Sequence, residues 1–264
     1  MHVVSLHRYP IKGCRGHDLA VATLDALGVV GDRRMLLIDE NDRFLSQREE
    51  PRLATLVPAL NGDALVVRTE GSTFEHEAPA EADRRVVTIF GDRVSAADQG
   101  NVAAAWFTGV LGRPCRLVAF DATSHRLVDP AFSPRVDAET AFTDGYPVLG
   151  VLQESLDDLN GQLDAPIPMA RFRPNVVLSG ALAWSEDAWH SLAMGTVVFD
   201  AVKPCARCVV SSTDQVTGDR HPHQEPLRTL TRLRLQRPFG AIFGQNLVSR
   251  STGTISVGDT VSCE

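Results

Sequence analysis

Two cysteines three residues apart form the most reactive pattern in the sequence. Cys205 and Cys208 stand in the run Lys203-Pro-Cys-Ala-Arg-Cys208. Thiolates bind soft metals, and cations such as Lys203 and Arg207 favour the thiolate form of a neighbouring cysteine. The run therefore indicates a metal-binding or redox-active thiol, although the pair alone is equally typical of two inert, buried cysteines.

Other cysteine and histidine residues offer two alternatives for this pair. A structural zinc site needs two more ligands, but Cys14, Cys115 and Cys263 stand singly, and the spacing of His221 and His223 is not that of a zinc pair. A thioredoxin-type disulfide is typical of a βαβ context, whereas a strand-like run precedes the pair here. We interpret the three single cysteines as structural or incidental.

Basic residues at predicted turns form a second pattern. Cations beside free backbone amides suit the capture of a phosphate, although each such stretch alone is typical of a solvated surface ion pair. The stretches are Tyr9-Pro-Ile-Lys-Gly-Cys14, Gly31-Asp-Arg-Arg34 and Arg171-Phe-Arg-Pro-Asn175.

The composition limits the partners and the compartment. A formal net charge of −7 argues against a nucleic-acid or acidic-membrane partner, because both require a basic face. The N-terminus has no signal-peptide pattern, and no stretch reaches the about 18 apolar residues that a membrane span requires. Five cysteines are an odd count, unlike disulfide-linked secreted domains. We therefore expect a cytoplasmic protein with no membrane association.

The elements that must position these residues are mostly strands. Short β-favouring runs and turn signals predict a β-barrel or sandwich in the first hundred residues, followed by a helix at Asn101–Leu111 and a strand at Cys115–Phe120. The polar stretch 121–140 has little periodicity and is predicted to be a linker or mobile segment, which divides the chain into domains 1–120 and 121–264. The expected early strands are 2–9, 19–27, 34–39, 44–48, 64–68, 85–90 and 93–97.

The second half is also predicted to be rich in strands. A Ser-x-x-Asp start, similar to a capping box, favours a helix over Ser155–Leu163, and a run rich in Leu and Arg favours another over 226–236. The expected strands are 175–179, 196–202, 207–212, 241–248 and 254–262. The fold class is therefore mixed α/β and strand-dominated.

In chain order, these stretches resemble the MOSC family, particularly relatives of the molybdenum-cofactor sulfurase C-terminal domain that carry an N-terminal β-barrel domain. The resemblance covers nearly the whole chain and implies an N-terminal β-barrel domain plus a C-terminal MOSC β-barrel with flanking helices, with the cofactor between them. It rests on the three basic stretches and on Gln47-Arg-Glu-Glu-Pro-Arg52, Thr143-Asp-Gly-Tyr-Pro147, Glu154-Ser-Leu-Asp-Asp-Leu-Asn160, Cys205-Ala-Arg-Cys208, Asp214-Gln-Val-Thr-Gly218 and Gly253-Thr-Ile-Ser-Val-Gly-Asp259.

The resemblance also implies a cofactor and its contacts. The cofactor is the molybdenum cofactor, molybdenum held by molybdopterin, with Cys208 as the protein ligand to the metal. A thiolate suits that role because it donates electron density strongly. The residues implied to contact the pterin and its phosphate are Lys12, Gly13, Arg33, Asp144, Gly145, Tyr146, Arg173, Asn175, Ala206 and Arg207.

Two functions follow from the resemblance. Similar family members are oxidoreductases that reduce N-hydroxylated compounds, which implies a small N-hydroxylated or N-oxide substrate and a separate electron-transfer protein: a ferredoxin, a flavoprotein or a cytochrome. Alternatively, the domain is a sulfur-carrier module with a persulfide on Cys208, since the same domain also follows a pyridoxal-phosphate desulfurase half in sulfurases. This chain shows neither that half nor the grouped cysteines of an iron–sulfur domain.

Overall fold

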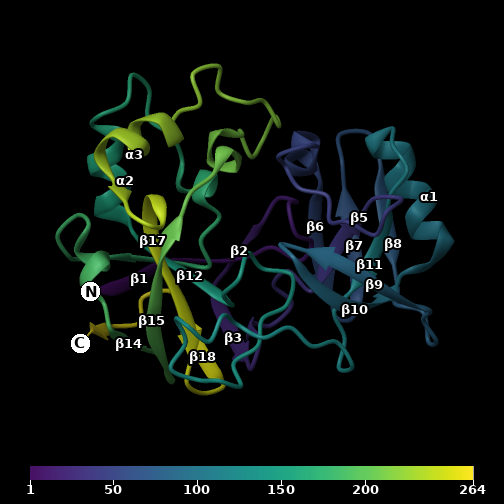
Figure 1. Ribbon diagram of the computed structural model, residues 1–264, viewed down its shortest axis with the longest axis horizontal. Coiled ribbons are helices and arrows are strands. Elements are labelled where there is room, and N and C mark those ends of the chain that lie inside the picture. Colours follow the sequence, from purple (N-terminus) through teal and green to yellow (C-terminus); the bar gives the residue numbers. More distant parts are fainter. Residues whose placement is uncertain (264) are drawn as a thin grey trace.

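The computed structural model describes residues 1–263 as two β-rich halves that lie side by side (Figure 1). The half that contains both termini is built on a nine-stranded sheet, and the other half contains two smaller sheets and one helix. The prediction of a mixed, strand-dominated fold is confirmed.

The large sheet combines strands from both ends of the chain. Its strands are mostly antiparallel, but β12 and β13 pair in parallel. In spatial order the strands are β19 (Val261–Cys263), β14 (Ser191–Met194), β15 (Val197–Ala206), β17 (Gly240–Ser249), β12 (Val148–Leu152), β13 (Val176–Ser179), β1 (His2–Arg8) and β2 (His17–Leu19), with β16 (Leu235–Gln236) paired to β17.

The second half is formed by the segment from β5 (Met35–Ile38) to β11 (Arg116–Ala119). Its helix α1 (Gly100–Leu111) packs on β11. One sheet has the order β5 (Met35–Ile38), β11 (Arg116–Ala119), β10 (Asp92–Asp98) and β9 (Arg84–Ile89), and the other has β6 (Val57–Asn61), β7 (Ala64–Arg68) and β8 (Thr73–His76).

The chain crosses between the halves near both ends. A third small sheet joins β3 (Val21–Asp25) and β4 (Gly28–Val29) to the late strand β18 (Gly253–Ser256). Together with β1, these strands place the first thirty residues beside the C-terminal strands rather than in the second half. The loops after β1 and β4 therefore start in one half and enter the other.

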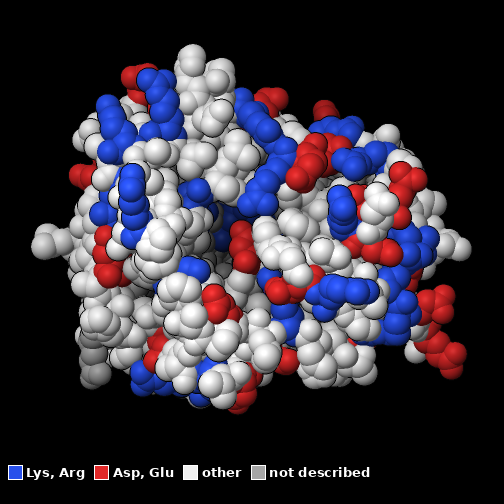
Figure 2. Space-filling view, viewed as in Figure 1, with Lys and Arg blue, Asp and Glu red and all other residues white. Residues whose placement is uncertain are grey.

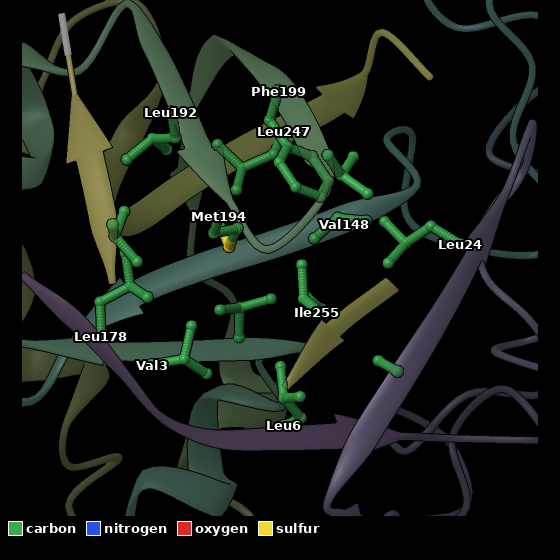
Figure 3. Packing of buried hydrophobic residues seen from close by; sticks show 14 of the residues in the cluster. Val3, Leu6, Leu24, Val148, Leu178, Leu192, Met194, Phe199, Leu247 and Ile255 are labelled. Atoms are coloured by element: carbon green, nitrogen blue, oxygen red, sulfur yellow. The ribbon is translucent and has the colours of Figure 1, made fainter. Parts of the chain in front are cut away.

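Aliphatic side chains fill the core of the large half, as the composition indicates. Figure 3 shows side chains from distant parts of the chain meeting there, including Val3 and Leu6 of β1, Leu24 of β3 and Leu247 of β17. A separate cluster around Phe107 packs α1 against the sheets of the other half. The two cores account for two β-rich units with an interface between them.

The helices begin at other residues than predicted. Helix α1 starts at Gly100, whose amide donates to Asp98, while the side chain of Asn101 accepts a bond from Arg116. Helix α2 (Gln153–Asn160) starts before Ser155, so the capping-box prediction is wrong. The Ser155 hydroxyl instead donates to buried Glu186 in the 3-10 helix η3 (Ser185–Ala188). Helix α3 (Leu227–Leu233) ends before β16.

Two predicted strands are wrong, and one of them carries the site. Residues 207–212 form a turn and the 3-10 helix η4 (Val209–Ser212), because the amide and hydroxyl of Ser211 both bond the carbonyl of Cys208 and turn the chain away from β17. In the run 44–48, Phe44 makes only an isolated bridge to Ile38 of β5, and the chain then turns at residues 47–49, where the Ser46 hydroxyl donates to Glu49. Short side chains that bond nearby backbone or side-chain groups compete with strand pairing.

The polar stretch 121–140 contains no helix or strand, but it is not a free linker. Val128 and Ala138 are buried against Val248 of β17. Arg126 donates to the carbonyls of Ala141 and Thr143. The stretch is therefore packed along its length. Among residues 1–263, no helix is long and apolar enough to cross a membrane.

Candidate functional site

A cleft lies between the two halves and is lined by residues from both. Figure 2 shows this face hollowed near its centre, with basic side chains at the hollow. Every predicted site residue except Gly145 lines the cleft. The lining residues predicted from the sequence are Lys12, Gly13, Arg33, Asp144, Tyr146, Arg173, Asn175, Ala206, Arg207 and Cys208.

Arg33, Arg173 and Asn175 form one buried group around Tyr9, which we call the arginine cluster. The guanidinium carbons of Arg33 and Arg173 lie 4.5 Å and 4.4 Å from the centre of the Tyr9 ring. Arg33 also donates to the carbonyl of Arg173 at 3.0 Å. The Tyr9 hydroxyl donates to the carbonyl of Pro174, so the ring is fixed. The cluster therefore holds two like charges together in a rigid frame.

The backbone of both arginines is strained. Arg33 has φ 47° and Arg173 has φ 55°, in the left-handed region that side chains larger than glycine rarely adopt. Burial and the charge of Arg33 lower the pKa of Arg173 to about 10. The Nη2 atom of Arg173 is buried without a hydrogen-bond partner among the described residues. Strain, repulsion and an unpaired donor in one place indicate that an anion belongs there.

Asn175 positions Arg33 rather than facing the cleft with a free side chain. Its oxygen accepts from Arg33 at 3.2 Å and from the amide of Leu149, and its nitrogen donates to the carbonyl of His7. Asp32 adds a 2.7 Å ion pair to the same guanidinium. The direction of Arg33 is thus set by both halves of the chain.

Lys12 and Asp144 form an ion pair in the cleft. The Lys12 side chain is buried, and that burial lowers its pKa to about 8 despite the charge of Asp144. The Asp144 side chain is 79% exposed. Some desolvation opposes its ionisation, but Lys12 and Arg33 outweigh it and hold the pKa of Asp144 below its usual range. Next to Lys12, Gly13 has φ +84° and its carbonyl accepts a bond from Gln47.

The segment Cys205–Cys208, which we call the cysteine loop, forms the opposite wall. Arg207 donates to the sulfur of Cys205 at 2.8 Å and to the carbonyl of Phe172 at 2.6 Å. Burial raises the pKa of Cys205 against the effect of Arg207, so this thiol stays protonated near neutral pH. Cys208 is half-buried and lies where β15 ends and η4 begins. The two cysteines of the pair thus have different surroundings.

Arg48 is a site residue that sequence reasoning missed. It lines the cleft, and contact with the Cys208 sulfur raises the pKa of Arg48, although desolvation opposes that shift. Its position in the stretch Gln47-Arg-Glu-Glu-Pro-Arg52 could have identified it, because the family resemblance includes this stretch. The second half of the molecule therefore also reaches the reactive sulfur.

Tyr146 lines one side of the cleft, and Gly145 precedes it in the chain. Burial raises the pKa of Tyr146 to about 12, and its hydroxyl has no partner among residues 1–263. The ammonium of Lys203 lies 5.8 Å from the Tyr146 ring. Gly145 is adjacent to two lining residues without lining the cleft itself.

The charge of the cleft is opposite to that of the protein. Its charged lining residues are five cations (Lys12, Arg33, Arg48, Arg173 and Arg207) and one carboxylate, Asp144, in a chain of net charge −7. The described part of the chain holds no group of three or more His, Cys, Asp and Glu residues placed to bind a metal ion. The fold and the site define a protein of two β-rich halves with a basic cleft between them that also contains two cysteines.

Comparisons with known proteins give the family. The MOSC N-terminal β-barrel domain matches residues 1–114, and the MOSC domain matches residues 137–262. The chain is 33% identical to mitochondrial amidoxime-reducing component 1 of Mus musculus, covering 98% of this chain and 81% of that protein. The human protein of the same name is 32% identical, with 98% and 82% covered. The chain belongs to the MOSC family.

A third relative has another function in its name. Molybdenum cofactor sulfurase of Oryza sativa subsp. japonica is 28% identical over 90% of this chain, which spans 31% of that protein. The name of this relative connects the family to the molybdenum cofactor. The resemblance stated from the motifs is therefore confirmed.

Proposed function

We propose that this protein is a molybdenum-cofactor-dependent reductase of N-hydroxylated or N-oxide compounds, with Cys208 as the protein ligand to molybdenum. The observation that carries the proposal is the unpaired Nη2 of Arg173, buried in a cleft that also contains a cysteine. An anionic cofactor would supply an acceptor for this Nη2 atom, and the metal that it carries would supply a partner for the cysteine. The names of the amidoxime-reducing relatives support the reaction type.

The residues of the cleft fit this cofactor. Arg33 and Arg173 would bind the phosphate through planar, bidentate donors, whereas Lys12 would act as a point charge. Gly13 has a positive φ, and a side chain at this position would press against buried Leu53, so glycine suits the turn beside Lys12. Cys208 would hold the metal, while Cys205 stays a thiol bonded to Arg207. The remaining predicted contacts are Asp144, Gly145, Tyr146, Asn175, Ala206 and Arg207.

The chemistry divides between the cofactor and the chain. When bound, the molybdenum cofactor supplies two-electron chemistry that takes an oxygen atom from nitrogen. The overall reaction consumes two electrons and two protons, breaks the N–O bond and releases water. The chain orients the reacting groups, and Arg48 and Arg207 keep positive charge beside the two sulfurs. A cationic wall stabilises negative charge that develops during bond cleavage.

The electrons come, in this proposal, from a separate electron-transfer protein, which is a ferredoxin, a flavoprotein or a cytochrome. The acidic net charge favours a docking partner with a basic face. A cytoplasmic location remains a prediction, because the relatives named above are mitochondrial. We also propose a domain boundary near residue 120, which lies between the two family matches.

Metal and pterin analysis of protein made in a cofactor-producing host tests the proposal. We expect about one molybdenum per chain and reduction of an amidoxime with a chemical electron donor. Cys208→Ala is expected to abolish turnover with the fold retained, and Cys205→Ala serves as the matched control. Protein without molybdenum, or unchanged turnover in Cys208→Ala, would overturn the proposal. A persulfide on Cys208 in intact-mass measurements, without reductase activity, would favour the sulfur-carrier alternative.

A further inference from the structure

A phenylalanine occupies a turn position that does not suit it. Phe90 and Gly91 form the two-residue connection between β9 and β10, with φ 50° and 96°. Hairpin turns with two left-handed residues favour Asn-Gly, because asparagine tolerates this conformation and larger side chains are strained in it. Strain of this kind persists where a function requires the side chain.

The Phe90 ring is exposed toward the cleft. The residue keeps 43% of its surface accessible and is one of the cleft-lining residues. Phe44, which also lines the cleft, packs against it with ring centres 4.7 Å apart and an angle of 53°. The cleft lining also contains Tyr146 and Phe172, but the Phe44 and Phe90 rings lie beside the cations Lys12 and Arg48. An exposed aromatic surface in such a place suits a flat apolar ligand.

Phe90 lies close to the groups that would carry the reaction. The Arg48 guanidinium is 5.5 Å from the centre of the ring, and Arg48 lines the cleft together with Cys208, whose sulfur interacts with it electrostatically. The Lys12 ammonium is 5.0 Å from the same ring. One side chain therefore separates the ring from the reactive sulfur. A molecule that reacts at a metal held by the Cys208 sulfur would therefore place a substituent within reach of the Phe90 ring.

We propose that Phe90 is a stacking platform for a flat, conjugated substituent of the substrate, so that aromatic N-hydroxylated compounds are preferred over small aliphatic ones. The proposal rests on the proposed function. The cations of the cleft attract the anionic end of the cofactor, whereas the uncharged Phe90 ring does not. The exposed ring surface is thus left for the substrate.

Two substrates that differ only in the ring test the platform: benzamidoxime and acetamidoxime. In Phe90→Asn we expect KM for benzamidoxime to rise about fivefold, with KM for acetamidoxime and molybdenum content unchanged. Asparagine suits the turn, so the thermal unfolding midpoint is expected to rise by about 2 °C, which excludes misfolding as the cause.

Phe90→Tyr keeps the ring and is expected to behave as the unchanged protein. Val86→Asn, on an exposed position of β9 outside the cleft lining, is the matched control.

Binding of the reduced products separates this proposal from the proposed function. By calorimetry on the cofactor-loaded protein, we expect benzamidine to bind about fivefold more tightly than acetamidine, and Phe90→Asn to remove the difference. If this preference is found without turnover of either amidoxime, the reductase proposal fails and the platform stands. A preference that survives Phe90→Asn, or a loss of molybdenum in that variant, overturns the platform.

Discussion

The arginine cluster and the cysteine loop face the same cleft but are built differently. Tyr9, Arg173 and Asn175 are buried, and hydrogen bonds and ring contacts hold the cluster together from both halves. In the cysteine loop, Cys205 and Cys208 are only half-buried, and Arg207 holds the loop through few bonds. One wall is therefore rigid before any ligand arrives, while the other keeps a reactive sulfur accessible.

This difference matches the two tasks of the proposed function. Retention of an anionic group benefits from donors that are already fixed, because less conformational entropy is lost on binding. Turnover requires that substrate and product reach the sulfur-bound centre. Changes in the arginine cluster should thus alter how much cofactor is held, whereas changes near the cysteine loop should alter the rate of the protein that holds it.

Replacement of Arg173 is expected to have the largest effect on cofactor retention. Arg173→Gly suits the left-handed backbone and removes the unpaired donor, so we expect molybdenum content to fall by about 10- to 100-fold, in line with the loss of a charge-assisted hydrogen bond. Arg171→Lys is the matched control, since Arg171 lies in the 3-10 helix η2 (Met169–Phe172), which ends just before Arg173, but does not line the cleft. Normal molybdenum content in Arg173→Gly would contradict the role of the arginine cluster.

Replacement of Arg48 is expected to separate rate from retention. Arg48→Met removes the cation that contacts the Cys208 sulfur, and we expect kcat to fall about tenfold while molybdenum content stays unchanged. Arg52→Met is the control, because Arg52 pairs with Glu50 and lies outside the cleft lining. Steady-state kinetics and metal analysis on the same samples check this prediction. If molybdenum content fell together with kcat, the arginine cluster and the cysteine loop would not have the separate effects on retention and rate that we expect.

Lys12 gives the cleft a dependence on pH. With a pKa of about 8, its ammonium loses a proton as the pH rises through 8, so the cofactor-free protein loses a positive charge there. We expect affinity for inorganic phosphate to fall about tenfold between pH 7 and pH 9. In Lys12→Arg, the affinity for inorganic phosphate should not fall between pH 7 and pH 9. In Asp144→Asn the fall should move to lower pH, because Asp144 raises the pKa of Lys12. Titration calorimetry at several pH values measures this, and a flat profile in the unchanged protein would contradict it.

The smallest effect is expected from Tyr9→Phe. The substitution removes only the 3.0 Å bond from the hydroxyl to the carbonyl of Pro174, and the ring under both arginines remains. We expect the free energy of unfolding to fall by about 1 kcal/mol, measured in urea, with molybdenum content unchanged. Tyr9→Leu removes the ring as well and should reduce both quantities. Equal behaviour of the two variants would show that the ring does not support the arginines.

Much of the fold could be predicted from local patterns. Alternating apolar residues identified strands such as β7 and β10, and helix formers identified α1. The run 207–212 misled because Val209 and Val210 favour strands, while the bonds from Ser211 to Cys208 that form the turn depend on a single hydroxyl and its amide. Ser155 misled in the same way, because its partner Glu186 is distant in sequence. Whether such a serine supports the predicted element or bonds another group depends on hydrogen-bond partners that the local sequence pattern does not reveal.

The kinds of residue at the site could be read from the chain before folding: a cysteine pair, basic turns and a family resemblance that ordered them. Packing of the two halves was needed to show that Arg33 and Arg173 share the Tyr9 ring, and that Arg48 and Phe90 line the same cleft as Cys208. These contacts join residues as distant in the sequence as Tyr9 and Arg173. Their formation depends on the loops after β1 and β4, which lead from one half into the other, and this is a property of the packed chain and not of any segment alone.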